Sequence, residues 1–323
     1  MPDVTFASVE EAVCILQGVA HYTPVLTNTP LDAQSGAQVF LKCENFQRVG
    51  AFKFRGAYHA VARSLSSQPS RVFVTVSSGN HGQGLALACQ LLGAAAHVVM
   101  PKPFSVMKHR GVLSYGAQVH VVEDRNYADA KMNELVRDYH AVVVHPFNDP
   151  FVIAGQGTLM VEFIDQVANL DMVLAPVGGG GLLSGLCLAA EALRPHMAIF
   201  ACEPACAMDA MASVRQNRIV LMPNQNTVAD GLRTSLGELT LPILRQHVTG
   251  FFAVGEDEII QAMQFAQDRL KLVIEPSSAV ALAPLLRQEP QLAGKRVGVV
   301  LTGGNAEGQP LLDGTKLRQR ECD

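Results

Sequence analysis

Short hydrophobic runs alternate with helix-like segments along most of the chain. The runs are rich in Val, Ile and Phe, and each has about the length of one buried strand. They cover Val72–Val76, His97–Met100, Gln118–Val122, Ala141–His145, Met172–Pro176, Ala198–Cys202 and Val297–Leu301. Helical patterns lie between them, at Leu85–Leu92, Tyr127–Tyr139, Leu182–Leu193 and Asp257–Leu270. Strands that alternate with helices at this spacing predict an α/β fold with open, twisted and mainly parallel sheets.

The number and spacing of these runs predict two sheets rather than one wide sheet. At 323 residues the chain is long for one domain and of ordinary length for two. The closely spaced runs within residues 71–148 predict a small domain, and residues 1–70 with 149–323 predict a larger one. Ligands of open α/β sheets bind at the carboxyl ends of strands. The glycine-rich motifs described below follow predicted strands, so we expect them to converge on one cleft.

The composition permits a large core and gives no sign of a nucleic-acid or membrane partner. The chain is 49% hydrophobic and has a formal net charge of -4, without a basic run. Acidic residues precede the first apolar stretch, which argues against a secretory signal, and no apolar run has membrane-spanning length. Seven cysteines without paired spacing fit a reducing compartment. The sequence therefore predicts a soluble cytoplasmic protein.

The first candidate motif surrounds Lys53 in the segment Glu44–Ala57, which reads ENFQRVGAFKFRGA. Phe52 and Phe54 flank the lysine. Apolar neighbours disfavour the charged amine, which lowers its pKa and frees it for imine formation with a carbonyl compound. Taken alone, the segment fits a surface lysine on an ordinary helix better than it fits a reactive lysine.

The second motif is the segment Val76–Gly84, which reads VSSGNHGQG and lies between a predicted strand and a predicted helix. Such a turn presents backbone N–H groups and the positive end of a helix dipole to an anion. Asn80 can donate a hydrogen bond to a phenolic oxygen or carboxylate, and Ser78 can transfer a proton. A tight turn permitted by glycine and capped by asparagine explains the same residues.

The third motif contains four successive glycines, Gly178–Gly181, before another predicted helix. Their bare backbone amides allow a phosphate to approach closely. Glu203 lies about where a dinucleotide site has its ribose-binding acid, but Leu183 or Ser184 stands where the last glycine of G-x-G-x-x-G belongs. No Gly-Lys-Ser/Thr follows, which excludes a P-loop.

The fourth motif, Thr302-Gly303-Gly304-Asn305, again follows a predicted strand. Taken alone, this motif fits a structural turn better than a binding site.

Together, the four motifs resemble those of the fold-type II pyridoxal-phosphate (PLP) enzymes, which share the tryptophan synthase β fold. The resemblance runs from about Thr23 to Asn305 and is greatest to the serine/threonine dehydratase and serine racemase group. The segment Glu44–Ala57 is also similar to that of β-hydroxyaspartate dehydratases in the same group. The resemblance implies two domains around one PLP site.

The resemblance also implies a role for each motif toward the cofactor. Lys53 would carry PLP covalently and serve as the catalytic base. The other residues expected at the cofactor are Phe52 beside the ring, Asn80 at the phenolic oxygen, Thr302 at the pyridine nitrogen, Gly231 in the nearby loop, and Gly178, Gly179, Gly180 and Gly181 at the phosphate. Many relatives have Ser or Cys at the position of Thr302. The threonine is a mild departure that keeps a hydroxyl group there.

On the substrate side, the resemblance places Ser78 on the ring face opposite Lys53, as a second catalytic residue. The residues expected to hold the substrate are Ser77, Ser78, Gly79, Asn80, His81 and Ser235. Glu203, Ala207 and Asp209 match a loop that binds a divalent cation in the group. Two carboxylates, a carbonyl and water suit Mg²⁺ or Ca²⁺. A capped loop before a helix at Asp209–Val214 is the alternative explanation of these residues.

The expected reaction is dehydration of L-serine or L-threonine to a 2-keto acid and ammonia. The expected binding partner is the small amino-acid substrate, and the resemblance implies a homodimer. Racemisation of serine by Lys53 and Ser78 is the nearest alternative. A β-hydroxyaspartate substrate would need a cation for its second carboxylate, and Arg125 is the candidate in the small domain. Phenylserine is a further possible substrate. A non-catalytic nucleotide-binding protein is the remote alternative, and it leaves Lys53 without a task.

Overall fold

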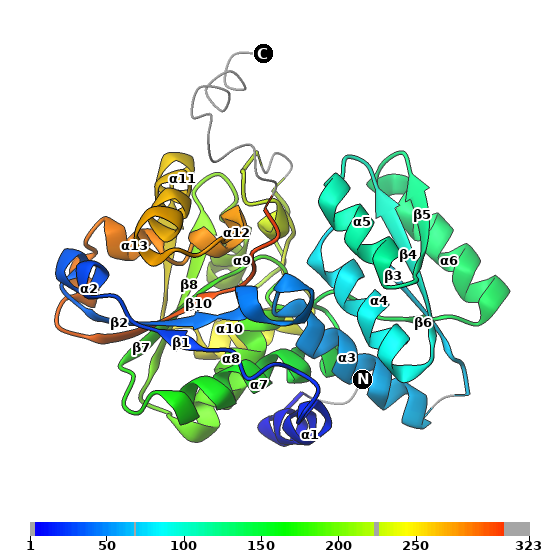
Figure 1. Ribbon diagram of the computed structural model, residues 1–323, viewed down its shortest axis with the longest axis horizontal. Coiled ribbons are helices and arrows are strands. Elements are labelled where there is room, and N and C mark those ends of the chain that lie inside the picture. Colours follow the sequence, from blue (N-terminus) through cyan, green and yellow to red (C-terminus); the bar gives the residue numbers. More distant parts are fainter. Residues whose placement is uncertain (1–3, 68, 223–225, 307–323) are drawn as a thin grey trace, which may run out of the picture.

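The computed structural model describes residues 4–67, 69–222 and 226–306. These residues fold around two separate sheets (Figure 1). The four-stranded sheet has the order β5-β4-β3-β6, and all its strands are parallel. Its strands are β3 (Val72–Val76), β4 (Ala95–Pro101), β5 (Gln118–Val122) and β6 (Val142–Val143). Three helices connect them, α4 (Asn80–Leu92), α5 (Val106–Ser114) and α6 (Ala128–Tyr139). We call this part the four-stranded half.

The six-stranded sheet has the order β1-β2-β10-β7-β8-β9 and is parallel except for β1, which pairs antiparallel with β2. Its strands are β1 (Val25–Leu26), β2 (Gln38–Cys43), β7 (Met172–Pro176), β8 (Ala198–Pro204), β9 (Gly250–Val254) and β10 (Arg296–Leu301). We call this sheet and its helices the six-stranded half. Its strands come from both ends of the chain. Two mainly parallel sheets confirm the predicted fold class.

Helices cover both faces of the six-stranded sheet. They are α1 (Phe6–Leu16), α2 (Thr29–Ser35), α7 (Pro150–Gln166), α8 (Gly181–Leu193), α9 (Asp209–Gln216), α10 (Thr240–His247), α11 (Glu256–Phe265), α12 (Pro276–Ala279) and α13 (Ala283–Leu286). The helix α3 (Lys53–Ser67) packs against both α7 and α4 of the four-stranded half. Short 3₁₀ turns include η1 (Glu44–Phe46), η2 (Arg48–Gly50), η3 (Arg125–Tyr127), η4 (Asp230–Leu232) and η6 (Pro290–Leu292), and η5 (Ala266–Leu270) is a π-helix.

Three predicted strands, β3, β5 and β7, have the same bounds in the structure. The run predicted at Ala141–His145 forms only the two-residue strand β6, and β2 and β9 were not predicted. The single helix expected at Asp257–Leu270 is divided into α11 and the π-helix η5. The domain boundaries near residues 70 and 149 stay a prediction.

Close glycine contacts fix α7 against its two neighbours. A Cβ atom at Gly185 of α8 would lie 2.5 Å from the backbone nitrogen of Gly157 in α7. On another side of α7, a Cβ atom at Gly155 would lie 2.7 Å from Gly56 Cα in α3. Neither position has room for a larger side chain, so α3 and α8 both pack tightly against α7. These helices begin at Lys53 and Gly181, two predicted site residues.

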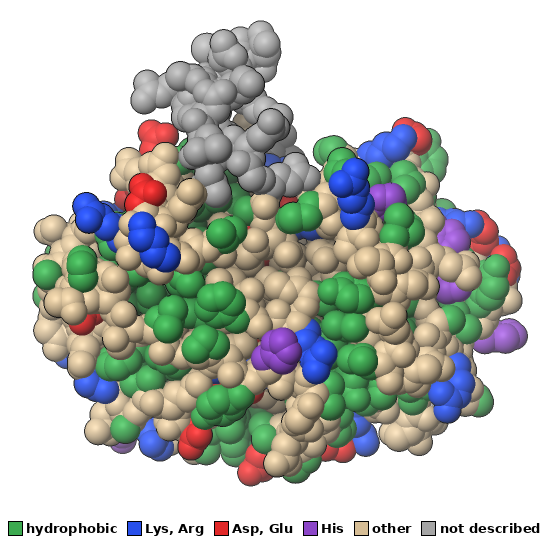
Figure 2. Space-filling model, in the orientation of Figure 1, with side chains coloured by type: hydrophobic (Ala, Val, Ile, Leu, Met, Phe, Trp, Pro, Cys, Tyr) green, Lys and Arg blue, Asp and Glu red, His purple; other side chains and the backbone are tan. Residues whose placement is uncertain are grey.

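On the face shown in Figure 2, basic and acidic side chains are scattered and do not gather into one basic patch. None of the helices in the described part of the chain is both long and apolar enough to cross a membrane.

Candidate functional site

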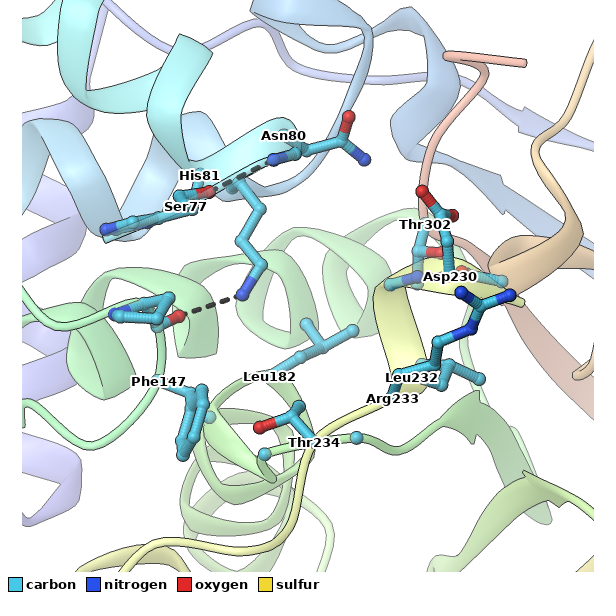
Figure 3. Close-up of a pocket in the computed structure, with 18 of the residues that line it drawn as sticks. Ser77, Asn80, His81, Phe147, Leu182, Asp230, Leu232, Arg233, Thr234 and Thr302 are labelled. Carbon is cyan, nitrogen blue, oxygen red and sulfur yellow. Dashed lines mark hydrogen bonds between the residues drawn. The ribbon is translucent and has the colours of Figure 1, made fainter. Parts of the chain in front are cut away.

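A pocket lies where the two halves meet, at the carboxyl ends of strands from both sheets (Figure 3). It brings together all four sequence motifs. Its lining includes Phe52, Lys53, Ser77, Ser78, Gly79, Asn80, His81, Gly178, Gly179, Gly180, Gly181, Gly231 and Thr302. The expected convergence on one cleft is therefore observed.

Lys53 is the first residue of α3, and it lines the pocket. Its Nζ donates a hydrogen bond of 2.8 Å to the carbonyl oxygen of Pro146 and lies 5.1 Å from the ring centre of Phe52. Burial lowers the pKa of this amine to about 8, although the carboxylate of Glu275 acts in the opposite direction. An amine with such a pKa supplies the neutral nucleophile and base near neutral pH.

The turn after β3 is fixed by the hydroxyl of Ser77. Its Oγ accepts hydrogen bonds from Gly79 N at 3.2 Å and Gly82 N at 3.1 Å. The helix α4 then begins at Asn80, so the turn and the first N–H groups of the helix face the pocket. This arrangement suits a carboxylate. Ser78 lines the same pocket.

His81 lines the pocket with a buried, neutral ring. Its ring nitrogen Nε2 lies 3.1 Å from the carbonyl oxygen of Val144. Burial, together with the charge of Lys53, lowers the pKa of His81 to about 3. The imidazole of His81 therefore carries no charge that would attract a carboxylate.

Asn80 is held by residues of the six-stranded half. Its Nδ2 donates to Glu275 Oε1 at 2.7 Å, and its Oδ1 accepts from Asn305 Nδ2 at 2.9 Å. An amide nitrogen carries two hydrogens, so one remains for the phenolic oxygen that the sequence analysis assigned to Asn80.

The glycine loop after β7 requires residues without side chains. Gly180 has φ +85°, and a Cβ atom at Gly179 would overlap the ring of Phe147. The hydroxyl of Thr240 donates to the carbonyl oxygen of Gly179 at 2.8 Å and so orients the loop. Because α8 begins at Gly181, its dipole adds positive charge at the same place. The loop therefore fits a phosphate group.

Thr302 follows β10 and is buried, and its hydroxyl forms no hydrogen bond with the rest of the described chain. Its carbonyl oxygen accepts from Phe52 N at 3.1 Å, which places the strand end beside the lysine segment. This free hydroxyl inside the pocket can bind a ring nitrogen. Gly231 N donates to Ser277 Oγ at 2.9 Å. The pocket lining near Gly231 extends to Thr234 and does not include Ser235, which was expected there.

Charged residues that the sequence analysis did not single out connect the two halves across the pocket. Lys108 of α5 lies 2.7 Å from Asp230 Oδ2 and 3.6 Å from Glu275 Oε2. Burial raises the pKa of Glu275, and Lys108 opposes this rise. Lys108 and Glu275 are 167 residues apart in sequence (275 − 108). No glycine motif or periodicity marks either position, so only the fold reveals the contact.

The expected cation loop lies outside the pocket, at the end of β8. Both carboxylate oxygens of Glu203 accept hydrogen bonds from α9, from Ala210 N at 2.8 Å and Met211 N at 2.9 Å. Burial raises the pKa of Glu203 to about 8, and the nearby carboxylate of Asp209 adds to the rise. Two close carboxylates fit a divalent cation, which would favour their ionised forms. The described residues contain no group of three or more His, Cys, Asp and Glu suited to a metal.

Comparisons with known proteins agree with this geometry. A family model described as "Pyridoxal-phosphate dependent enzyme" matches residues 16–303. The chain belongs to this family. A serine racemase of Dictyostelium discoideum is 40% identical to this PLP enzyme over 312 residues, 95% of this chain and 96% of that protein. A beta-hydroxyaspartate dehydratase of Paracoccus denitrificans (strain Pd 1222) is 43% identical over 290 residues, 88% of this chain and 91% of that protein.

A solved structure of a threonine deaminase from T.th. matches with a TM-score of 0.89 and 38% identity, covering 96% of this chain and all of that one. This PLP enzyme therefore belongs to the fold-type II group that contains ammonia-lyases and racemases. The pocket residues fit the cofactor. Lys53 offers the amine, the loop Gly178–Gly181 the phosphate site, and Thr302 a buried hydroxyl.

Proposed function

We propose that this PLP enzyme dehydrates and deaminates a small β-hydroxy amino acid to a 2-keto acid and ammonia, with L-serine and L-threonine as its simplest substrates. One observation supports this most. The amine of Lys53, the turn Ser77–His81 and the glycine loop Gly178–Gly181 line the same pocket. An amine base, a carboxylate site and a phosphate site are what a β-elimination on PLP requires.

The protein's own contribution is to orient the substrate and to move its protons. PLP, when bound, withdraws electrons from the substrate's Cα and so acidifies the Cα–H bond. The N–H groups at the start of α4 bind the α-carboxylate. Lys53, whose pKa is lowered to about 8, accepts the Cα proton as a neutral amine. The neutral hydroxyl of Thr302 adds no charge at the ring nitrogen, which favours elimination over chemistry that needs a long-lived carbanion.

The role of Lys53 is tested by the Lys53→Ala variant. The purified wild type should be yellow and should release keto acid from L-serine or L-threonine. The variant should fold, judged by circular dichroism, but lose the visible absorbance and at least about 1,000-fold in turnover, because it lacks both the covalent attachment and the base. Borohydride should trap the cofactor on Lys53 of the wild type. A trapped adduct on another lysine would contradict the proposal.

Racemisation of serine is the second candidate, favoured by the position of Ser78 in the same pocket as Lys53. Elimination requires only removal of the Cα proton, whereas racemisation also requires a proton donor on the opposite face. Loss of a positioned proton donor costs roughly 100-fold or more in its step. Ser78→Ala should therefore suppress D-serine formation far more than keto-acid release, measured by chiral chromatography and a keto-acid assay on the same samples. Equal loss of both activities would mean that Ser78 only positions the substrate.

Several finer expectations are part of the proposal. A divalent cation, Mg²⁺ or Ca²⁺, is proposed at Glu203, Ala207 and Asp209. We also propose that the enzyme acts as a cytoplasmic homodimer. Phenylserine remains an alternative substrate for the same pocket.

A further inference from the structure

The segment between β6 and α7 connects three parts of the pocket. The carbonyl oxygen of Pro146 accepts the hydrogen bond from Lys53 Nζ at 2.8 Å. The next residue, Phe147, lies against the glycine loop. The side chain of Asn148 accepts a hydrogen bond of 2.9 Å from the backbone nitrogen of Leu239, just before α10. The conformation of this segment therefore affects the lysine, the phosphate site and the loop before α10 together.

His145 fixes the peptide bond that carries the Pro146 carbonyl. Its Nδ1 accepts hydrogen bonds from Phe147 N at 3.3 Å and from Asn148 N at 2.9 Å. The peptide bond between Pro146 and Phe147 is trans, so its C=O and N–H lie in one plane and point in opposite directions. Because His145 holds the N–H on one side, the carbonyl oxygen on the other side is directed at Lys53.

The ring of His145 remains an acceptor near neutral pH. Nδ1 accepts two hydrogen bonds, so the proton of the neutral imidazole is on Nε2. Burial and the charges of Lys53 and Arg125, which both line the pocket, lower the pKa of His145 to about 4. A protonated ring would have no acceptor at Nδ1 and would release the peptide. The carbonyl of Pro146 is therefore held in one orientation near neutral pH.

An oriented carbonyl helps Lys53 to accept a proton. The hydrogen bond to Pro146 uses one N–H of the amine and leaves its lone pair for the Cα proton of the substrate. When the amine becomes an ammonium, the bond is kept and its donor becomes charged, and charged donors form stronger hydrogen bonds than neutral ones. The carbonyl thus stabilises the protonated lysine, which proton transfer produces, more than the neutral lysine.

We propose that His145 is a positioning residue for proton transfer, because it aims the Pro146 carbonyl at the amine of Lys53. The proposal rests on the proposed function, in which Lys53 takes the Cα proton. His145 does not line the pocket, so it acts through the peptide bond and transfers no proton itself. It gives a task to a histidine that none of the sequence motifs contains.

The test compares substitutions of His145. His145→Asn keeps an oxygen acceptor close to the position of Nδ1, and His145→Leu removes the acceptor at similar size. His145→Gln, whose amide lies one bond further out, replaces the leucine variant if that variant does not fold. His196→Leu is the matched control, because His196 is an exposed histidine that does not line the pocket. Glu275 and His81, which interact electrostatically with Lys53, are the same in all these proteins.

The first measurement follows Lys53 in the cofactor-free proteins. Trinitrobenzenesulfonate labels the neutral amine, so the pH midpoint of labelling reports the pKa of Lys53. His145→Leu should lower this midpoint by roughly 1 unit, because the charged amine loses an acceptor. His145→Asn and His196→Leu should keep the wild-type midpoint. A histidine that only packs the pocket would give the opposite sign, since water entering a loosened pocket would raise the midpoint toward the ordinary lysine value.

The second measurement uses the holoenzyme and the better substrate of L-serine and L-threonine, with hydrogen or deuterium at Cα. His145→Leu should lower kcat by roughly 10- to 100-fold, the usual effect of losing a hydrogen bond to a charged group, with KM changed less than about 3-fold. The deuterium isotope effect on kcat should be at least as large as in wild type, because proton transfer limits the rate. His145→Asn should recover most of the rate. Visible absorbance measures how much cofactor each variant binds.

The failures of the two ideas are distinguishable. If wild type releases keto acid but the Lys53 midpoint in His145→Leu is unchanged or moves toward the ordinary lysine value, the role of His145 is wrong and the proposed function stands. If the midpoint falls as expected but the wild-type holoenzyme releases keto acid from no β-hydroxy amino acid, the proposed function fails. The Pro146 carbonyl then remains the acceptor that His145 orients toward Lys53, without a part in this reaction.

Discussion

At the scale of single residues, Lys53 has the most consequential environment in the molecule. The side chain lies beside the Phe52 ring and donates to one backbone carbonyl, that of Pro146. Burial disfavours its charged form more than Glu275 favours it, so the pKa is lowered to about 8. Below this pKa the amine is protonated and loses its reactivity as a nucleophile and base.

The lowered pKa predicts the pH dependence of Lys53 modification in the cofactor-free enzyme. Only the neutral amine reacts with trinitrobenzenesulfonate, so the rate of labelling at Lys53 should rise with pH through a midpoint near 8. Mass spectrometry of the Lys53 peptide measures this rate. In urea-unfolded protein the midpoint of the same peptide should move to about 10.4, the ordinary value for lysine. A midpoint that does not differ between folded and unfolded protein would contradict the assigned environment.

The residues that could be predicted from the sequence are those with a local signal. The glycine loop Gly178–Gly181 and the strand-end turn at Ser78 are recognisable because each combines unusual composition with a neighbouring strand and helix. Lys108 and Glu275 have no such signal. Each resembles an ordinary surface charge until the fold brings the two together, and the same holds for Thr234, which lines the pocket where Ser235 was expected.

At the scale of elements, a buried cluster of charges fixes the start of α3, which carries Lys53. Arg55 donates from Nε to Glu44 Oε2 at 2.8 Å and from Nη1 to Glu162 Oε1 at 2.6 Å. Glu162 also accepts from Lys42 at 2.9 Å. Burial alone would raise the pKa of Glu44, but the charge and hydrogen bonds of Arg55, the hydrogen bond from Thr23 and the charge of Lys42 together outweigh burial and lower the pKa. The cluster therefore holds α3, β2 and α7 together through interactions that depend on every member.

Removal of Arg55 should strongly destabilise the protein. Arg55→Met leaves Glu44 buried without its main partner, and breaking such a pair costs roughly 3–5 kcal/mol of unfolding free energy. Arg63 of the same helix is the matched control. It pairs with Glu11 at 2.9 Å, but both side chains are partly exposed, so Arg63→Ala should cost less than about 1 kcal/mol. Urea denaturation of the cofactor-free proteins measures both values. Similar small costs for the two variants would contradict the importance of the cluster.

The loop between β8 and α9 yields a prediction about metal binding. If a divalent ion binds Glu203 and Asp209 in the native state, mass action stabilises that state. Chelator should lower the melting temperature, and Mg²⁺ or Ca²⁺ should restore it. The Glu203→Ala, Asp209→Ala double variant should lose this response. Differential scanning fluorimetry measures the melting temperatures. A double variant that responds to metal as wild type does would place the ion elsewhere.

Elements with a simple apolar pattern could be predicted, and those that depend on distant partners could not. β7 is a continuous apolar run and β3 is apolar except for Thr75, and the bounds of both were predicted correctly. β2 contains Lys42, whose buried amine is compensated by distant partners: it donates to Glu162, Gln166 and the carbonyl oxygen of Thr23. The π-helix η5 prolongs α11 without any change in side-chain periodicity that would mark it in the sequence.

At the scale of the whole molecule, the fold class followed from the alternation of strands and helices. Parallel strands bring their carboxyl ends to one edge of their sheet, which is why the motifs after β7 and β10 lie together in the pocket. The motif after β3 comes from the other sheet and reaches the same pocket from the four-stranded half. The antiparallel pairing of β1 did not follow from the sequence, because a two-residue strand has no measurable period.

The contacts of Lys108 and Asn80 with Asp230 and Glu275 run from the four-stranded half to the six-stranded half. They couple the position of one half to that of the other through charged groups. Since the side chain of Asp230 is 46% exposed, dissolved ions screen its attraction to Lys108. Ionic strength therefore acts on the strength of the contact between the two halves.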